Sequence, residues 1–72
     1  MTHETNKKTR LIVRRNGEYL VGKDMIRPAL RWSISPYDAW HTRSQDKAWT
    51  VARAVGGTVM MFNPIVGEMK VF

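Results

Sequence analysis

The segment RLIVRRNGEYLVGK, residues 10–23, carries the strongest local signal in the sequence. Two runs typical of β-strands, Arg10–Arg15 and Glu18–Lys23, flank the dipeptide Asn16-Gly17. Asn-Gly is the preferred two-residue loop of a type I′ β-hairpin, because both of its positions need a positive φ. The dipeptide therefore predicts an antiparallel hairpin and fixes which residues of the two strands lie opposite each other.

This register predicts two different faces, since opposed residues share a face. It runs from Arg15 opposite Glu18 at the loop to Arg10 opposite Lys23 at the open end. The face assigned to the core holds Leu11, Val13, Leu20 and Gly22. The outer face is cationic and holds Arg10, Ile12, Arg14, Tyr19, Val21 and Lys23.

A third strand is predicted at residues 30–34, after a loop marked by Arg27-Pro28. The residues alternate between apolar and polar, which is typical of a half-buried strand. Leu30, Trp32 and Ile34 would then point inward, with Arg31 and Ser33 outward.

Two alternatives remain for the segment that begins with Ser35-Pro36-Tyr37-Asp38. Ser35 could cap a long helix that has Pro36 at its first position. We favour a turn over these four residues followed by a short strand over Ala39–Arg43, because a better helix start lies just downstream.

That helix is predicted over residues 45–55. Ser44 is a good N-cap, and Ala48, Val51, Ala52 and Val55 follow with helical spacing. Gly56-Gly57 supplies a left-handed C-cap. A last hairpin pairs residues 58–62 with residues 68–72 across the turn Asn63–Gly67. The sequence thus predicts an α+β domain over residues 10–72, with an antiparallel sheet of about five to six short strands and one helix packed on one face. Residues 1–9 are predicted to form a disordered polar arm.

The composition limits what so small a domain can do. The chain has 72 residues and no cysteine, and its 12 Lys and Arg against 6 Asp and Glu give a net charge of +6. A chain of this length holds one domain, and its core is too small to enclose a large active site. The polar beginning resembles no signal peptide, and no apolar run approaches the roughly 18 residues of a membrane span. We expect a cytoplasmic protein without a membrane partner.

Residues 7–31 contain eight basic and two acidic residues, so the net charge is concentrated there. Such asymmetry favours an anionic partner. The candidate site combines cations for phosphate contacts with one ring for stacking: Arg10, Arg14, Tyr19, Lys23 and Arg31. The alternative is a solvated outer face with Arg14 stacked over Tyr19.

Three aromatic residues are candidates for a protein interface: Tyr37, Trp40 and Trp49. Trp49 falls one position off the apolar stripe of the predicted helix, and exposed tryptophans are common interface anchors. The alternative is that Trp49 only covers the rim of a thin core.

The sequence gives little support for catalysis. Asp38 and His41 could form a triad with Ser33, Ser35 or Ser44, but triads are defined by geometry and not by local spacing. No clustered metal ligands and no nucleotide-binding motif occur. We therefore expect a protein that is not an enzyme and uses no metal, cofactor or small-molecule substrate.

From about residue 30 onward the chain carries a set of small and turn-forming residues: Ser35-Pro36-Tyr37-Asp38-Ala39-Trp40, Ala48, Ala52, Gly56-Gly57, Phe62-Asn63-Pro64 and Gly67. In these it resembles small uncharacterised proteins of phages and prophages. The resemblance implies an origin in a mobile element and a compact α+β fold. It also raises the option that the protein disables a host defence protein, such as a CRISPR-type nuclease.

Three functions follow as hypotheses. The first is an accessory protein that engages nucleic acid, or a nucleic-acid-handling protein, through the cationic hairpin face. The second is a protein–protein inhibitor that uses the aromatic anchors. The third is a homodimer, in which the last strand pairs edge to edge with a second copy.

Overall fold

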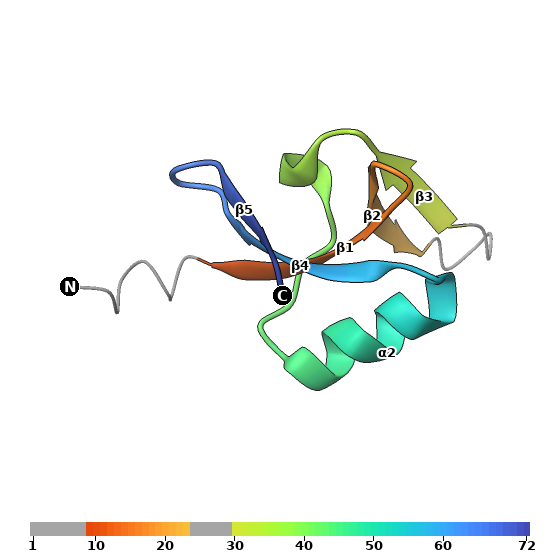
Figure 1. Cartoon of the computed structure of the whole chain (residues 1–72). Helices are drawn as coiled ribbons and strands as arrows, with labels where there is room; N and C mark the ends of the chain where they lie inside the picture. Colours follow the sequence, from red (N-terminus) through yellow and green to blue (C-terminus); the bar gives the residue numbers. More distant parts are fainter. Residues whose placement is uncertain (1–8, 24–29) are drawn as a thin grey trace.

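The computed structural model describes residues 9–23 and 30–72. The described residues form a five-stranded antiparallel sheet in the order β3-β2-β1-β4-β5, with helix α2 packed on one face (Figure 1). In chain order the elements are β1 (Arg10–Arg15), β2 (Glu18–Lys23), β3 (Leu30–Ser33), η1 (Pro36–Asp38), α2 (Gln45–Val55), β4 (Thr58–Asn63) and β5 (Glu68–Val71). This is the predicted α+β fold. The predicted arm, apart from Thr9, and the predicted loop over 24–29 lie outside the described residues.

The Asn-Gly loop is confirmed, but the long hairpin is not. Asn16 and Gly17 have φ values of 51° and 79°, as a type I′ turn requires. The β1–β2 ladder in the described residues holds two of the predicted pairs, Arg14 with Tyr19 and Arg15 with Glu18. The predicted pairs further from the loop, from Val13–Leu20 to Arg10–Lys23, are wrong.

The segment after η1 enters between β1 and β2 and separates them. The Trp40 N–H donates to the Leu20 carbonyl at 2.8 Å. Leu11 and Thr42 exchange two backbone hydrogen bonds, of 2.9 and 3.0 Å. These groups take the hydrogen bonds that the outer part of the hairpin would have used.

Neither alternative for residues 35–43 describes the structure fully. Pro36 does occupy the first position of a helical turn, but the turn is a 3-10 helix of three residues that stops at Ala39, where ψ is 142°. The short strand predicted over Ala39–Arg43 is wrong, since this segment contributes only the isolated bridge between Leu11 and Thr42.

The third strand ends one residue earlier than predicted. Ser33 Oγ accepts a hydrogen bond from the Ser35 N–H at 3.0 Å, and this turn leads the chain away from the sheet. Ile34 is consequently 82% exposed, so its predicted inward orientation is wrong. Trp32 is half-buried and packs against the core, as predicted. The predicted orientation of Leu30 lies outside what is described of its side chain.

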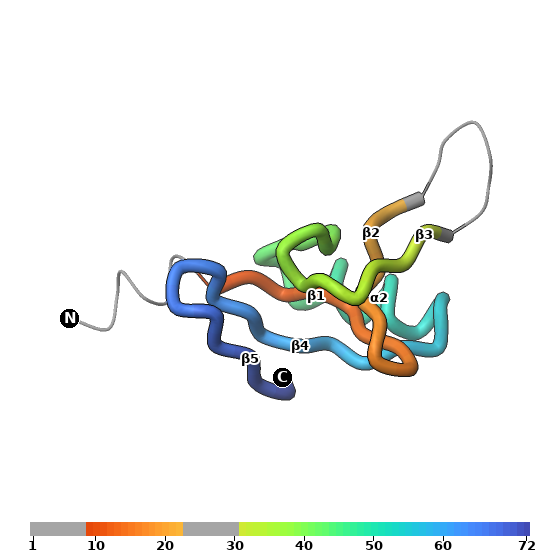
Figure 2. Tube along the Cα trace, turned by 90° about the horizontal axis from the view of Figure 1, so that it is seen from above, coloured from red at the N-terminus to blue at the C-terminus, as the bar shows by residue number. Residues whose placement is uncertain are grey.

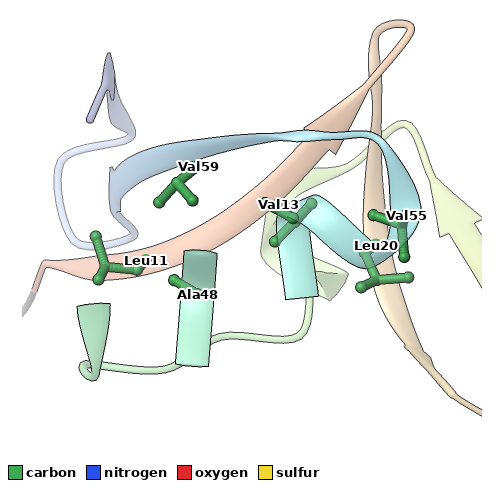
Figure 3. Packing of buried hydrophobic residues seen from close by; sticks show 7 residues of the cluster. Leu11, Val13, Leu20, Ala48, Val55 and Val59 are labelled. Carbon is green, nitrogen blue, oxygen red and sulfur yellow. The ribbon is translucent and has the colours of Figure 1, made fainter. Parts of the chain in front are cut away.

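Helix α2 begins and ends as predicted. Ser44 Oγ accepts from the Lys47 N–H at 3.3 Å, and Gly56 has the left-handed φ of 71°. Ala48 and Ala52 are fully buried, so the helix lies close to the sheet. The buried side chains between helix and sheet, most of them labelled in Figure 3, are Leu11, Val13, Leu20, Ala48, Ala52, Val55 and Val59.

A second buried cluster lies on the opposite face of the sheet. It consists of Ile12, Ala39, Met60 and Phe62, all of them at most 6% exposed. The segment of η1 and Ala39 covers this face, as Figure 1 shows above the sheet. Ile12 was predicted on the outer face and is fully buried. The central strand β1 is therefore buried on both sides.

The C-terminal hairpin is confirmed, with β4 paired to β5 from Asn63–Glu68 to Met60–Val71. Figure 2 shows β5 at the outside of the sheet, next to β4. Within the described residues, no helix has both the length and the apolar character that crossing a membrane requires.

Gly57 provides a test of the packing between the end of α2 and β1. A Cβ at this position would lie 2.7 Å from Val13 Cγ1 and 2.9 Å from the Arg14 carbonyl oxygen. We expect Gly57→Ala to lower the free energy of unfolding by about 1–3 kcal/mol, as overpacking does. Gly22→Ala is the matched control, since a Cβ there meets nothing within 4 Å. Urea unfolding of both variants measures the difference, and an equal loss in both would contradict this packing.

Candidate anion-binding surface

Most of the residues predicted to bind an anionic partner lie on the face of the sheet opposite α2. These are Arg10, Arg14, Tyr19 and Arg31. Arg14 is paired with Tyr19, and Tyr19 with Ser33, so these three side chains share a face. The backbone of Lys23 ends β2, but its side chain lies outside what is described.

This face is not an open platform, because η1 lies across its middle. Tyr19 is half-buried and packs against the second buried cluster, so only part of its ring is accessible. The Asp38 carboxylate of η1 accepts a hydrogen bond from Ser33 at 3.4 Å. The structure therefore distributes the cations around η1, with Arg10 at one end of β1 and Arg14 at the other.

The structure brings Arg10 together with two residues that the sequence analysis did not select. The bridge between Leu11 and Thr42 is antiparallel, so Arg10 and Arg43 are neighbours across it. His41 precedes Thr42 and shares this side of the backbone with Arg43. Arg43 and His41 are exposed, and Arg10 is half-buried. We call Arg10, His41 and Arg43 the basic cluster.

Arg10 and Arg43 place positive charge beside His41. Partial burial of the imidazole, followed by the charges of Arg10 and Arg43, lowers the pKa of His41 below its usual 6.5. Both side chains that act on the imidazole by charge are cationic. A bound anion would reverse this effect, because it stabilises the protonated ring.

The remaining cation of the hairpin, Arg15, has a structural role. Its guanidinium lies 4.2 Å from the centre of the Trp32 ring and donates to the Val55 carbonyl at 2.9 Å. Arg15 therefore ties the hairpin to the last turn of α2. The backbone pairing of Arg15 with Glu18 is retained beside this contact, as is that of Arg14 with Tyr19.

The three aromatic candidates do not form one surface. Tyr37 is 58% exposed, and its ring meets Phe62 edge-on at 5.0 Å on the η1 side of the sheet. Trp40 is half-buried and packs against the core beneath α2. Trp49, on α2, is 39% exposed and lies 6.2 Å from the ring of Phe72. A partner would contact Tyr37 and Trp49 from opposite sides of the sheet.

The described residues form open grooves on the surface. One groove of about 370 Å³ is lined by Leu20, Gly22, Trp40 and Val51. Another, of about 470 Å³, lies at the hairpin tip and is lined by Arg14, Arg15, Asn16, Gly17, Gly56, Thr58, Met60 and Val71. The described residues contain no group of three His, Cys, Asp or Glu side chains that could hold a metal ion.

Comparison with known proteins gives no match to a protein family, a curated protein or a solved structure.

The pKa of His41 tests the proximity of the two arginines. In an NMR titration we expect His41 to titrate below 6.5, and Arg43→Gln to raise its pKa. Above pH 6.5 His41 is neutral in both the folded and the unfolded chain, so it does not change the free energy of unfolding. As the pH falls below 6.5, the unfolded chain binds the proton first, because the pKa of His41 is lower in the folded chain. The free energy of unfolding therefore decreases until the pH reaches the folded-state pKa.

Two controls define this titration. His3→Asn removes the second histidine signal, and Arg53→Gln removes an arginine on α2 that does not act on His41. A His41 pKa that responds equally to Arg43→Gln and Arg53→Gln would disprove the basic cluster.

Proposed function

We propose that the protein is a non-enzymatic accessory module that binds nucleic acid through the basic cluster. The observation that carries the proposal is the bridge between Leu11 and Thr42, because it holds Arg10 beside Arg43. Two neighbouring arginines on a fixed backbone are spaced for contacts to phosphate oxygens, which supply most of the affinity of sequence-independent nucleic-acid binding.

Three further features support a nucleic-acid partner. The net charge of the whole chain is +6, which favours association with a polyanion. Arg14 and Arg31 are exposed on the same face of the sheet and extend the positive surface beyond the basic cluster. Tyr19 offers part of its ring, so its contribution to base stacking is secondary to the phosphate contacts.

The phage or prophage origin suggested by the resemblance of residues 30–72 belongs to the same proposal. A protein of a mobile element that binds nucleic acid would act in the host cytoplasm. There it would either cover nucleic acid directly or compete with a host protein that handles it.

A host protein is the second candidate partner, and the exposed rings of Trp49 and Phe72 favour it. They lie 6.2 Å apart and are 39% and 38% exposed. Adjacent exposed rings suit an interface anchor. Binding of this kind would depend weakly on salt and strongly on Trp49.

Fluorescence anisotropy with short labelled single-stranded DNA and RNA tests the proposal. We expect binding that weakens with salt, with a slope of about −2.8 in a logarithmic plot when Arg10, Arg14, Arg31 and Arg43 each contact one phosphate. Arg10→Gln combined with Arg43→Gln should reduce the magnitude of the slope by about 1.4, the value for two lost contacts.

The matched control is Lys47→Gln combined with Arg53→Gln, which removes the same charge from the exposed side of α2. Equal effects of the two double variants would show attraction by net charge alone and contradict a site at the basic cluster. Absence of binding at low salt would reject nucleic acid as the partner.

A further inference from the structure

The outer edge of β5 is open to pairing. β5 is the last strand of the sheet, and no described strand lies beyond it (Figure 2). The Phe72 N–H donates to the Val59 carbonyl at 3.1 Å. Along an antiparallel strand, the backbone N–H and C=O groups of successive residues point alternately to one side of the strand and to the other. Those of Phe72 and Lys70 therefore point to β4, whereas those of Val71 and Met69 point away from the sheet. The edge therefore presents backbone donors and acceptors at two positions.

We propose that β5 pairs antiparallel with β5 of a second copy of the chain, with Met69 opposite Met69 of the second copy. The two Met69 residues would then exchange two backbone hydrogen bonds, because both turn their N–H and C=O groups outward. In this register Glu68 of each copy lies directly opposite Lys70 of the other. The pairing goes beyond the proposed binding of nucleic acid and does not depend on it.

The charges on β5 select this register. Glu68 and Lys70 share one side of the strand, where their charged atoms lie 3.8 Å apart with the side chains 57% and 64% exposed. A register shifted by two residues would place Lys70 against Lys70 of the second copy, and like charges directly opposite each other are destabilising. Edge charges usually discourage pairing. Here they are complementary to a second copy of the same edge.

Exposed apolar side chains at the two ends of β5 fit the same arrangement. Val66, at the turn before β5, is 69% exposed, and Phe72, after β5, is 38% exposed. The Met69-centred register brings the Val66 end of one copy to the Phe72 end of the other, at both ends of the pair. The side chain of Val71 is 69% exposed, and part of it would also be buried in the dimer. The dimer would thus be stabilised by apolar contacts at both ends as well as by its two cross-strand pairs of opposite charge.

A charge-swap experiment tests both the dimer and its register. The self-association constant is measured by sedimentation equilibrium, without nucleic acid, for Glu68→Lys, for Lys70→Glu and for their mixture. We expect the unmodified chain to dimerise and each variant to associate at least about tenfold more weakly, because both cross-strand pairs become repulsive. The equimolar mixture should recover association, since every opposed pair is again of opposite charge.

Circular dichroism of each variant shows that the fold is retained. Recovery in the mixture cannot arise from a folding defect, so it supports the pairing directly. A monomeric unmodified chain at high concentration would overturn the proposal. Dimerisation that Glu68→Lys leaves unchanged would overturn the register. Neither result bears on nucleic-acid binding, which is measured separately.

Discussion

Burial of β1 on both of its faces organises the fold. Leu11 and Val13 face α2, and Ile12 faces η1, with exposures of 7% or less. A chain of 72 residues has little apolar surface to bury, and a strand covered on both faces uses it efficiently. Without the segment of η1 and Ala39, Ile12 would face water. The irregular connection between β3 and α2 therefore contributes to the core through Ala39.

The same arrangement determines where the charges of the hairpin can act. Because η1 covers the middle of the sheet face, the outer face predicted for the hairpin is not accessible as a whole. The insertion of residues 40–42 beside β1 compensates for this, since it brings Arg43 next to Arg10. The surface proposed for phosphate contacts thus arises from the tertiary structure, whereas the surface proposed for self-association is the edge strand β5.

Local sequence signals predicted the elements well. Asn16-Gly17 predicted the turn and Ser44 the start of α2, because these residues satisfy requirements of their own backbone. The errors arose where distant segments compete. Alternation alone placed Ile12 outside, because a single sequence does not show that a second layer covers the sheet. Arg43 was not selected, since its nearness to Arg10 depends on an insertion between two strands. The alternation of Trp40 and Thr42 with His41 and Arg43 was the one signal that could have suggested it.

We propose that the cations at the Arg10 end of β1 contact the anionic partner. A titration of the ¹⁵N-labelled chain with a short single-stranded oligonucleotide, followed in ¹H–¹⁵N correlation spectra, tests this most directly. We expect the largest chemical-shift changes at residue 10 and residues 41–43, with smaller changes at Arg14 and Arg31. Changes concentrated on α2 around Trp49, or spread evenly over all exposed cations, would contradict it.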